Sequence, residues 1–359
     1  MTPIVSATID TGALNHNLER VRHWAPRSRV MAVIKANAYG HGLICVARAL
    51  EAADAFAVAR VDEGLTLRNA GITKRTVLLE GVFDRDQLDA AAGAEFELVV
   101  HTAEQIELLR QAGPGAPFKI WLKLDTGMNR LGFKGEAFEQ ARSALSGLAR
   151  VQSPVNFFTH LASADLPELA TTSEQLRLFA QATGSLPGER SIANSAGMLG
   201  FPDSQADWVR PGLVLYGVSP FGGSIGADYG LKPAMTLNSH VIALKDLEPG
   251  ERVGYGGDWV AVRPTRLAVA AVGYGDGYPR ALASGSPVLV NGERAPLAGR
   301  VSMDMIGIDV TNLSPAPKLG DPVVLWGEGL PVEEIAVWSD TIPYELLCGI
   351  SQRVAVTLL

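Results

Sequence analysis

The chain of 359 residues contains only two cysteines, Cys45 and Cys348, and both lie among apolar residues. A disulfide framework is therefore not expected, and a reducing compartment fits this cysteine usage. The chain also has no basic block, because its 31 basic and 38 acidic residues are spread along it, for a formal net charge of -7. This distribution argues against nucleic acid or an anionic membrane as a partner.

Long hydrophobic runs are missing as well. No stretch reaches the roughly 18–20 apolar residues of a membrane-spanning helix. The first residues show no charged segment followed by an apolar one, as a signal peptide would. We therefore expect a cytoplasmic protein. Hydrophobic residues make up 47% of the chain, which is enough for a large core and for two domains.

The first two-thirds of the chain alternates short apolar runs with segments of helical periodicity, at about 25 residues per unit. This alternation predicts a parallel sheet, and eight or nine units favour a closed (β/α)8 barrel of the TIM type. A dinucleotide-binding fold is disfavoured, because the glycines of 273–277 lack the required spacing. The expected strands are Val5–Ile9, Val30–Ile34, Ala55–Ala59, Thr76–Leu79, Phe96–Val100, Lys119–Leu124, Val155–Thr159, Arg190–Ala193 and Gly212–Tyr216. The expected helices include Thr11–Trp24, Ala103–Gln111, Glu136–Leu145 and Ser173–Ala182.

The pattern changes near residue 230, after which short β-rich runs follow one another closely. We expect an α/β barrel over residues 1–231 and a separate, mostly β domain over residues 232–359. Asn291-Gly292 between two apolar runs predicts a hairpin, and only Val332–Ser339 has helical periodicity there. The first strand, Val5–Ile9, can pair either with the barrel or with the second domain.

The run Val33-Ile34-Lys35-Ala36-Asn37-Ala38-Tyr39-Gly40-His41-Gly42 is the most informative part of the sequence. It places a lysine where a buried strand opens into a loop, the end of a barrel strand that carries catalytic groups. A partly desolvated amine at such a position can react with an aldehyde such as that of pyridoxal phosphate. An ordinary surface lysine is the alternative for this residue taken alone.

Other polar residues follow later strands in the same way. Lys123 ends one run and Arg130 lies in the glycine-containing loop after it, where a guanidinium can bind an oxyanion. His160 ends the next run, and Asn194-Ser195 forms a small turn suited to a phosphate. Arg210 begins a buried-looking run, where a charge needs a specific partner.

The second domain adds tyrosines in glycine-rich loops, which are most often packing residues. Tyr255 lies in Val253-Gly254-Tyr255-Gly256, and Tyr278 follows Gly273-Tyr274-Gly275-Asp276-Gly277. Arg300 and Met303 share one further loop, and Tyr344 follows Pro343. Each of these segments is ambiguous when it is considered alone.

Taken together and in this order, the motifs resemble those of the alanine racemases, a family of fold-type III pyridoxal-phosphate enzymes. The resemblance covers nearly the whole chain and is greatest to the shorter, catabolic-type bacterial members. It implies a homodimer with shared active sites that interconverts L-alanine and D-alanine, for peptidoglycan or for catabolism. Serine or a broader range of amino acids is an alternative substrate range.

The same resemblance implies a role for each matching residue. Lys35 would hold the cofactor and act as one base, and Tyr255 of the other subunit would be the opposing base. The resemblance places Tyr39, Ser195, Gly212, Leu213, Tyr344 and Asn194 at the cofactor phosphate and Arg210 at the pyridine nitrogen. It places His160 between Tyr255 and Arg210, Arg130 at the phenolic oxygen, and Met303 with Arg130 at the substrate carboxylate. It implies that Lys123 is a carbamylated lysine and that the substrate entrance includes Asp165, Tyr278 and Arg300. No metal is implied.

Two other classes compete with this interpretation. A basic-amino-acid decarboxylase of the same fold type would be longer and would carry an acidic pocket that is not evident here. A non-catalytic pyridoxal-phosphate-binding protein would be a single barrel without the β domain and without a loop such as that of Tyr255.

Overall fold

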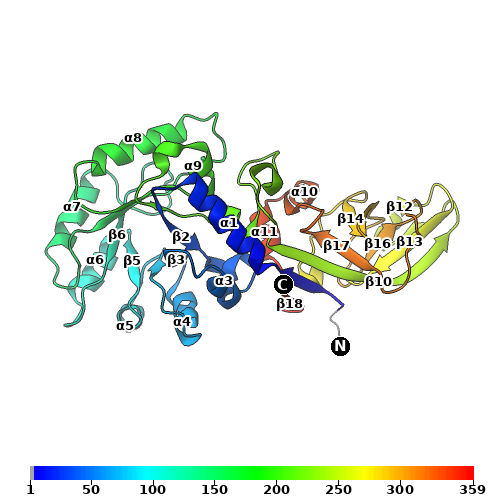
Figure 1. Ribbon diagram of the computed structural model, residues 1–359, viewed down its shortest axis with the longest axis horizontal. Helices are drawn as coiled ribbons and strands as arrows, with labels where there is room; N and C mark the ends of the chain where they lie inside the picture. The colour runs from blue at the N-terminus through cyan, green and yellow to red at the C-terminus, as the bar shows by residue number, and fades with distance from the viewer. Residues whose placement is uncertain (1–3) are drawn as a thin grey trace.

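The computed structural model describes residues 4–359, and eight parallel strands within them close into a barrel, as the sequence predicted. The barrel forms one lobe of the molecule in Figure 1. Closure occurs where the first of these strands, Arg29–Val33, pairs with the last, Trp208–Val209. The strands are β2 (Arg29–Val33), β3 (Ala55–Val58), β4 (Thr76–Leu78), β5 (Glu97–Val100), β6 (Ile120–Lys123), β7 (Asn156–Phe158), β8 (Arg190–Ser191) and β9 (Trp208–Val209).

Helices cover the outside of the barrel, and polar side chains fix where several of them begin. Asp10, Asp84, Thr102 and Asn194 each accept a backbone N–H in the first turn of the helix that follows. The helices are α1 (Thr11–Trp24), α3 (Leu43–Ala49), α4 (Val61–Asn69), α5 (Arg85–Gly93), α6 (Ala103–Arg110), α7 (Gly135–Ser146), α8 (Thr171–Thr183) and α9 (Ser195–Gly200), while α2 (Lys35–Tyr39) is a left-handed turn. None of the helices in the described part of the chain has both the length and the hydropathy to cross a bilayer.

One expected barrel strand is wrong. The run Gly212–Tyr216 is not a strand, because its last four residues form the 3-10 helix η2 (Leu213–Tyr216). The barrel is already closed by β9, which precedes this run. All four residues of η2 are buried. A short run that is apolar at every position has the same pattern in a buried helix and in a buried strand.

A largely antiparallel sheet forms the second lobe (Figure 1). Its eight strands are β1 (Ser6–Ile9), β10 (Met235–Leu247), β13 (Thr265–Ala270), β14 (Pro287–Val290), β15 (Glu293–Pro296), β16 (Ile306–Asp309), β17 (Pro322–Trp326) and β18 (Ala355–Leu358). Smaller elements are the hairpin β11 (Arg252–Val253) and β12 (Trp259–Val260), the helices α10 (Val332–Trp338) and α11 (Pro343–Cys348), and the 3-10 turns η1 (Pro202–Ser204), η3 (Gly226–Tyr229), η4 (Tyr255–Gly257) and η5 (Tyr274–Asp276). The helix α11 was not expected.

Two strand pairings bear on the sequence predictions for the first strand and for the hairpin at Asn291-Gly292. β1 lies between β10 and β18 in the second sheet, so the first strand of the chain belongs to the second domain and not to the barrel. Its pairing with β18 brings the N-terminal and C-terminal strands side by side. The predicted hairpin at Asn291-Gly292 connects β14 to β15, with φ of 51° and 83° at the two residues. Both values are those of a type I′ turn.

Candidate active site

A cavity of about 750 Å3 opens at the carboxyl ends of the barrel strands, where barrel enzymes carry their chemistry. Four cations line it, each from a strand end or from the loop that follows. They are Lys35 after β2, Lys123 at the end of β6, Arg130 in the next loop and Arg210 after β9. The predicted residues that meet here are Lys35, Tyr39, Lys123, Arg130, His160, Asn194, Ser195, Arg210, Gly212, Leu213 and Tyr344.

A left-handed turn sets the direction of Lys35. The four residues after it, Ala36–Tyr39, have φ between 52° and 54°, which costs non-glycine residues roughly 1–2 kcal/mol each. The Glu63 carboxylate accepts the Ala36 N–H at 2.6 Å, and the Asn37 side chain accepts the Leu43 N–H at 2.8 Å. These anchors keep the turn closed, so that Lys35 and Tyr39 line the same cavity.

The cations of the cavity lack counter-charges. Within residues 4–359, none of the four forms an ion pair with a carboxylate. Burial, together with the positive charges of Arg210 and Arg130, lowers the pKa of Lys123 to about 8. Unpaired positive charge in a partly buried site is unfavourable unless an anion binds there. The cavity is therefore suited to a ligand that carries negative charge.

Arg210 is buried and held by oxygen atoms instead of a carboxylate. It donates to the Ser191 hydroxyl at 2.7 Å and to the Thr159 carbonyl at 2.6 Å. Its Nη2 also lies 3.4 Å from Nδ1 of His160. Burial and the charge of Arg210 hold the pKa of His160 well below its usual range, so the imidazole is neutral. Because Nδ1 faces the Arg210 donor and acts as an acceptor, the single ring proton of His160 is on Nε2. Nε2–H is therefore the hydrogen-bond donor of this ring.

Hydroxyl groups from several elements also line the cavity. The Ser195 hydroxyl accepts the Gly212 N–H at 3.0 Å, and a Cβ at Gly212 would lie 2.5 Å from the Tyr39 hydroxyl. Only glycine fits there. Partial burial, and secondarily the charge of Asp165, raises the pKa of Tyr344 to about 12, and its ring lies 5.7 Å from that of Tyr39. Both phenols are therefore neutral donors, the kind of group that binds a phosphate.

Apart from Tyr344, the structure does not bring the predicted residues of the second domain into this cavity. Tyr255 is 71% exposed and Met303 is 52% exposed, each in a surface loop. Arg300 forms an ion pair with Asp258 beside them. Within one chain, the cavity and these loops therefore belong to different parts of the molecule.

Tyr278 was predicted at the substrate entrance, and the structure contradicts this placement. Its side chain is fully buried, and its ring stacks on Trp326 at 6.0 Å between centroids. Tyr274, four residues earlier, is 42% exposed and is the tyrosine of this loop that reaches the surface. Sequence reasoning missed it, because both tyrosines lie in the same glycine-rich turn and no pattern separates them.

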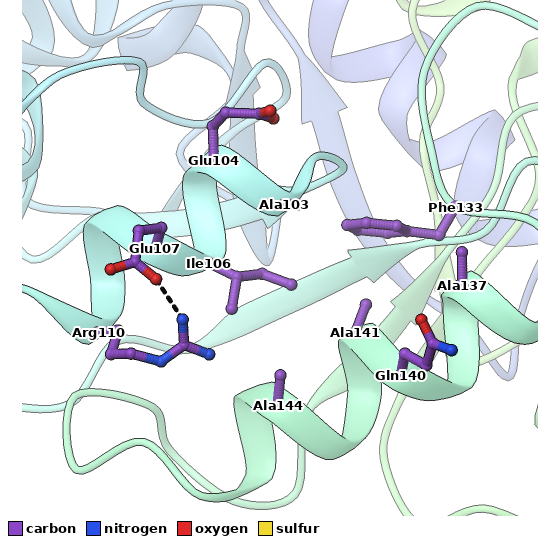
Figure 2. Close-up of a pocket in the computed structure, with 10 residues that line it drawn as sticks. All are labelled: Ala103, Glu104, Ile106, Glu107, Arg110, Phe133, Ala137, Gln140, Ala141 and Ala144. Carbon is purple, nitrogen blue, oxygen red and sulfur yellow. Dashed lines mark hydrogen bonds and ion pairs between the residues drawn. The ribbon is translucent and has the colours of Figure 1, made fainter.

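A second hollow lies on the outside of the barrel between α6 and α7 (Figure 2). Ile106, Phe133 and four alanines form its apolar wall, and the ion pair of Glu107 with Arg110 lies at its edge. The backbone of Phe133 pairs with that of Lys123 and Asp125, which anchors the far end of the loop that carries Arg130. This hollow holds no cluster of cations and none of the predicted site residues.

The fold and the cavity define a class of protein, the (β/α)8-barrel enzymes of the pyridoxal-phosphate-dependent type. Family models of the alanine racemase N-terminal and C-terminal domains match residues 9–220 and 234–358. The chain is 52% identical to the alanine racemase of Aeromonas hydrophila, over 97% of each chain. It is 51% identical to the biosynthetic alanine racemase of Escherichia coli K12, over 98% of each chain.

Solved structures agree with these relatives. The biosynthetic alanine racemase of Pseudomonas aeruginosa superposes with a TM-score of 0.95 at 42% identity over the whole of both chains. The alanine racemase of Bartonella henselae, solved with covalently bound pyridoxal phosphate, has a TM-score of 0.88 at 30% identity over 99% of each chain. The chain therefore belongs to the alanine racemase family of isomerases. The names of these relatives give no support to the catabolic-type subgroup that the sequence favoured.

Proposed function

We propose that this protein interconverts L-alanine and D-alanine with pyridoxal phosphate held by Lys35. The observation that carries the proposal is the position of Lys35, at the head of a left-handed turn in a cavity of unpaired cations. Pyridoxal phosphate, when bound, withdraws electrons from the α-carbon of the amino acid and makes its hydrogen acidic. The relatives named biosynthetic favour a role in supplying D-alanine.

The cavity fits this cofactor at both ends. Ser195, Tyr39, Tyr344 and the backbone around Gly212 offer neutral donors to a phosphate, and Leu213 and Asn194 complete this end. At the other end, Arg210 is held rigidly by its oxygen partners and would face the ring nitrogen. Arg130, which has no carboxylate partner in residues 4–359, is free to bind a phenolic oxygen or a substrate carboxylate.

Racemisation requires a base on each face of the reacting carbon. Lys35 is the base on the barrel side. We assign the opposite face to Tyr255 of a second subunit, because this tyrosine is exposed in its own chain. The ion pair between Asp258 and Arg300 connects the Tyr255 loop to the loop that carries the exposed Met303. His160 has its Nε2–H available to donate to that phenol, and Arg210 fixes the tautomer.

Lys123 is poised for modification by carbon dioxide. Because its pKa is lowered to about 8, a larger fraction of its amine is unprotonated and nucleophilic near neutral pH than for an ordinary lysine, about a tenth at pH 7. The amine nitrogen would bond to the carbon of carbon dioxide, lose its proton to solvent and become a carbamate anion. That anion would place a negative charge beside Arg130, which lacks one, and would hold the guanidinium in place.

A homodimer with shared active sites follows from this assignment. Two exposed apolar residues, Phe83 and Ile342, line the cavity, and Tyr255 and Met303 are exposed in the second domain. Association would cover both sets. We propose residues 1–231 as the cofactor-binding part and residues 232–359 as the part that completes the partner's site, apart from β1 in the second sheet. The two free thiols support a cytoplasmic location.

Mixed dimers test the shared site directly. Lys35→Ala and Tyr255→Phe are expected to be nearly inactive when each is assayed alone. Unfolding and refolding them together forms heterodimers in which one site has both defects and the other has neither. A random mixture should regain about a quarter of the wild-type rate, measured by chiral chromatography with L-alanine and with L-serine. No recovery would place Tyr255 in the same subunit as Lys35, and a Tyr255→Phe enzyme that is active when assayed alone would place this tyrosine outside the reaction.

A further inference from the structure

A buried glutamine behind the cavity connects the two loops that carry His160 and Arg130. Gln175 lies in α8, the helix labelled in Figure 1, and its exposed fraction is 1%. Its Nε2 donates to the Thr126 hydroxyl at 3.0 Å and to the His160 carbonyl at 3.1 Å. Its Oε1 accepts the Ala162 N–H at 2.9 Å, and this contact fixes which end of the amide is oxygen.

The connection continues as far as Arg210. The Thr126 hydroxyl, which accepts from Gln175, lies 2.9 Å from the Thr159 hydroxyl, and Thr126 and Thr159 are both buried. The carbonyl of Thr159 in turn accepts from Arg210. Thr126 lies three residues after Lys123 and four before Arg130, in the loop whose far end is fixed by the Phe133 backbone.

We propose that Gln175 is a positioning residue for the reaction, which holds the His160 loop and the Arg130 loop at a fixed separation. The inference rests on the proposed function, because it concerns where His160 and Arg130 stand relative to the reacting carbon. Every polar atom of the Gln175 side chain is used on one of these two loops. A buried network in which each member is satisfied fixes one arrangement, and a missing member leaves costly unpaired groups.

The charged groups around His160 predict how the network affects the pH dependence. The charged groups around His160 are Arg210 after β9, Lys123 at the end of β6, Arg130 in the loop after β6 and Lys35 after β2. Burial is the larger cause of the lowered pKa of His160, and these positive charges are the smaller one. When Gln175 is lost, the His160 loop gains freedom and water reaches the ring. Its pKa then rises toward the ordinary value, and activity on the acid side is lost at a higher pH.

Isosteric variants separate positioning from general stability. Gln175→Leu removes all three hydrogen bonds, and Thr126→Val removes the hydroxyl that joins the loops, while Thr126→Ser keeps it. Thr172→Val is the matched control, since Thr172 lies on the same buried face of α8 and its hydroxyl has no partner within residues 4–359. The pH profile of kcat/KM is measured on cofactor-saturated enzyme below the lowest melting temperature. Binding of pyridoxal phosphate to each apoprotein is titrated by absorbance.

Gln175→Leu is expected to lower kcat/KM at neutral pH by about tenfold to a hundredfold and to move the acid limb upward. Its affinity for pyridoxal phosphate should fall several-fold. Thr126→Val should show the same changes to a smaller degree, and Thr126→Ser and Thr172→Val should match the wild type. A Gln175→Leu profile that superimposes on the wild type, or a Thr126→Ser enzyme as impaired as Thr126→Val, would overturn the inference. If the wild type racemises nothing, the proposed function fails, and the cofactor titration alone decides the role of Gln175.

Discussion

The two lobes contribute very different halves of the proposed site. In the barrel, Lys123 and Arg210 are 6% and 3% exposed, and neighbouring oxygens hold Arg210 in place. In the second lobe, Tyr255 and Met303 lie in loops and are mostly exposed. The barrel half of the site is enclosed within one chain, whereas the side chains of the other half are largely open to solvent in that chain.

This difference indicates how binding and catalysis are divided. A preorganised set of cations and donors can bind an anionic cofactor without any help from a partner. The exposed tyrosine can act as a base only after association excludes water around it. Cofactor binding should therefore depend on groups of one chain, the barrel residues together with Tyr344, whereas racemisation should also require Tyr255 of a second subunit.

The largest expected effect is that of Lys35→Ala. Because this change removes the cofactor attachment and one base together, we expect kcat to fall by at least about 10^4-fold in both directions. The absorbance of the bound cofactor near the visible edge should disappear as well. Lys119→Ala, at the opposite end of β6 and half-exposed, is the control and should leave both unchanged. Residual turnover above one per cent would place the essential amine elsewhere.

Tyr255→Phe is expected to have the next largest effect, and it tests the comparison most sharply. We expect a loss of about 10^2 to 10^4 in kcat, with cofactor absorbance and affinity retained, because the barrel half is intact. The two directions should also differ in their α-hydrogen isotope effects, since a single base serves one face. Equal and small losses in both directions would argue against a tyrosine base.

The barrel half was largely predictable from the sequence, and the reason is geometric. Lys35, Lys123 and His160 each follow a run of buried residues, and the carboxyl ends of parallel strands converge at one mouth. The second half was less predictable, because exposure in a glycine-rich loop has no periodic pattern. Tyr274 and Tyr278 lie in the same turn, yet only Tyr274 is exposed.

Other features could not be read from residue types. Nothing in Ala36–Tyr39 predicts four successive left-handed residues, since their anchor Glu63 lies on another helix. Gln175 was also missed, because a glutamine in an amphipathic helix is expected to face water. The buried face of α8 is instead largely polar and consists of Thr172, Gln175, Phe179 and Thr183.

Lys123→Met should change stability with a sign set by the lowered pKa. The amine titrates at about 8 when folded and near its ordinary value of 10.5 when unfolded. Between these values the unfolded chain binds more protons, so the free energy of unfolding of the wild type should rise with pH. The variant should lose this rise and be more stable at pH 7 by about 1–3 kcal/mol. Urea denaturation of the apoprotein in buffer free of carbon dioxide measures both effects.

A wild-type curve that is flat over this range would mean that the Lys123 ammonium is better solvated than its 6% exposure implies. Lys119→Met serves as the control, because its ammonium is half-exposed and should give the wild-type slope. A barrel half that binds anions must destabilise its own cations when no anion is present.

The smallest expected effect is that of Ala36→Gly, which tests whether the barrel half stores backbone strain. Ala36 is exposed with φ of 53°, so glycine relieves the left-handed penalty without leaving a cavity, at the cost of a more flexible unfolded chain. We expect the free energy of unfolding to rise by about 0.5 kcal/mol. The opposite sign is expected for Ala137→Gly, because Ala137 is exposed within α7 (Figure 2) and should lose about 0.5–1 kcal/mol. If both variants lose stability equally, the turn after Lys35 carries no strain, and the position of that lysine is maintained by its hydrogen-bond anchors alone.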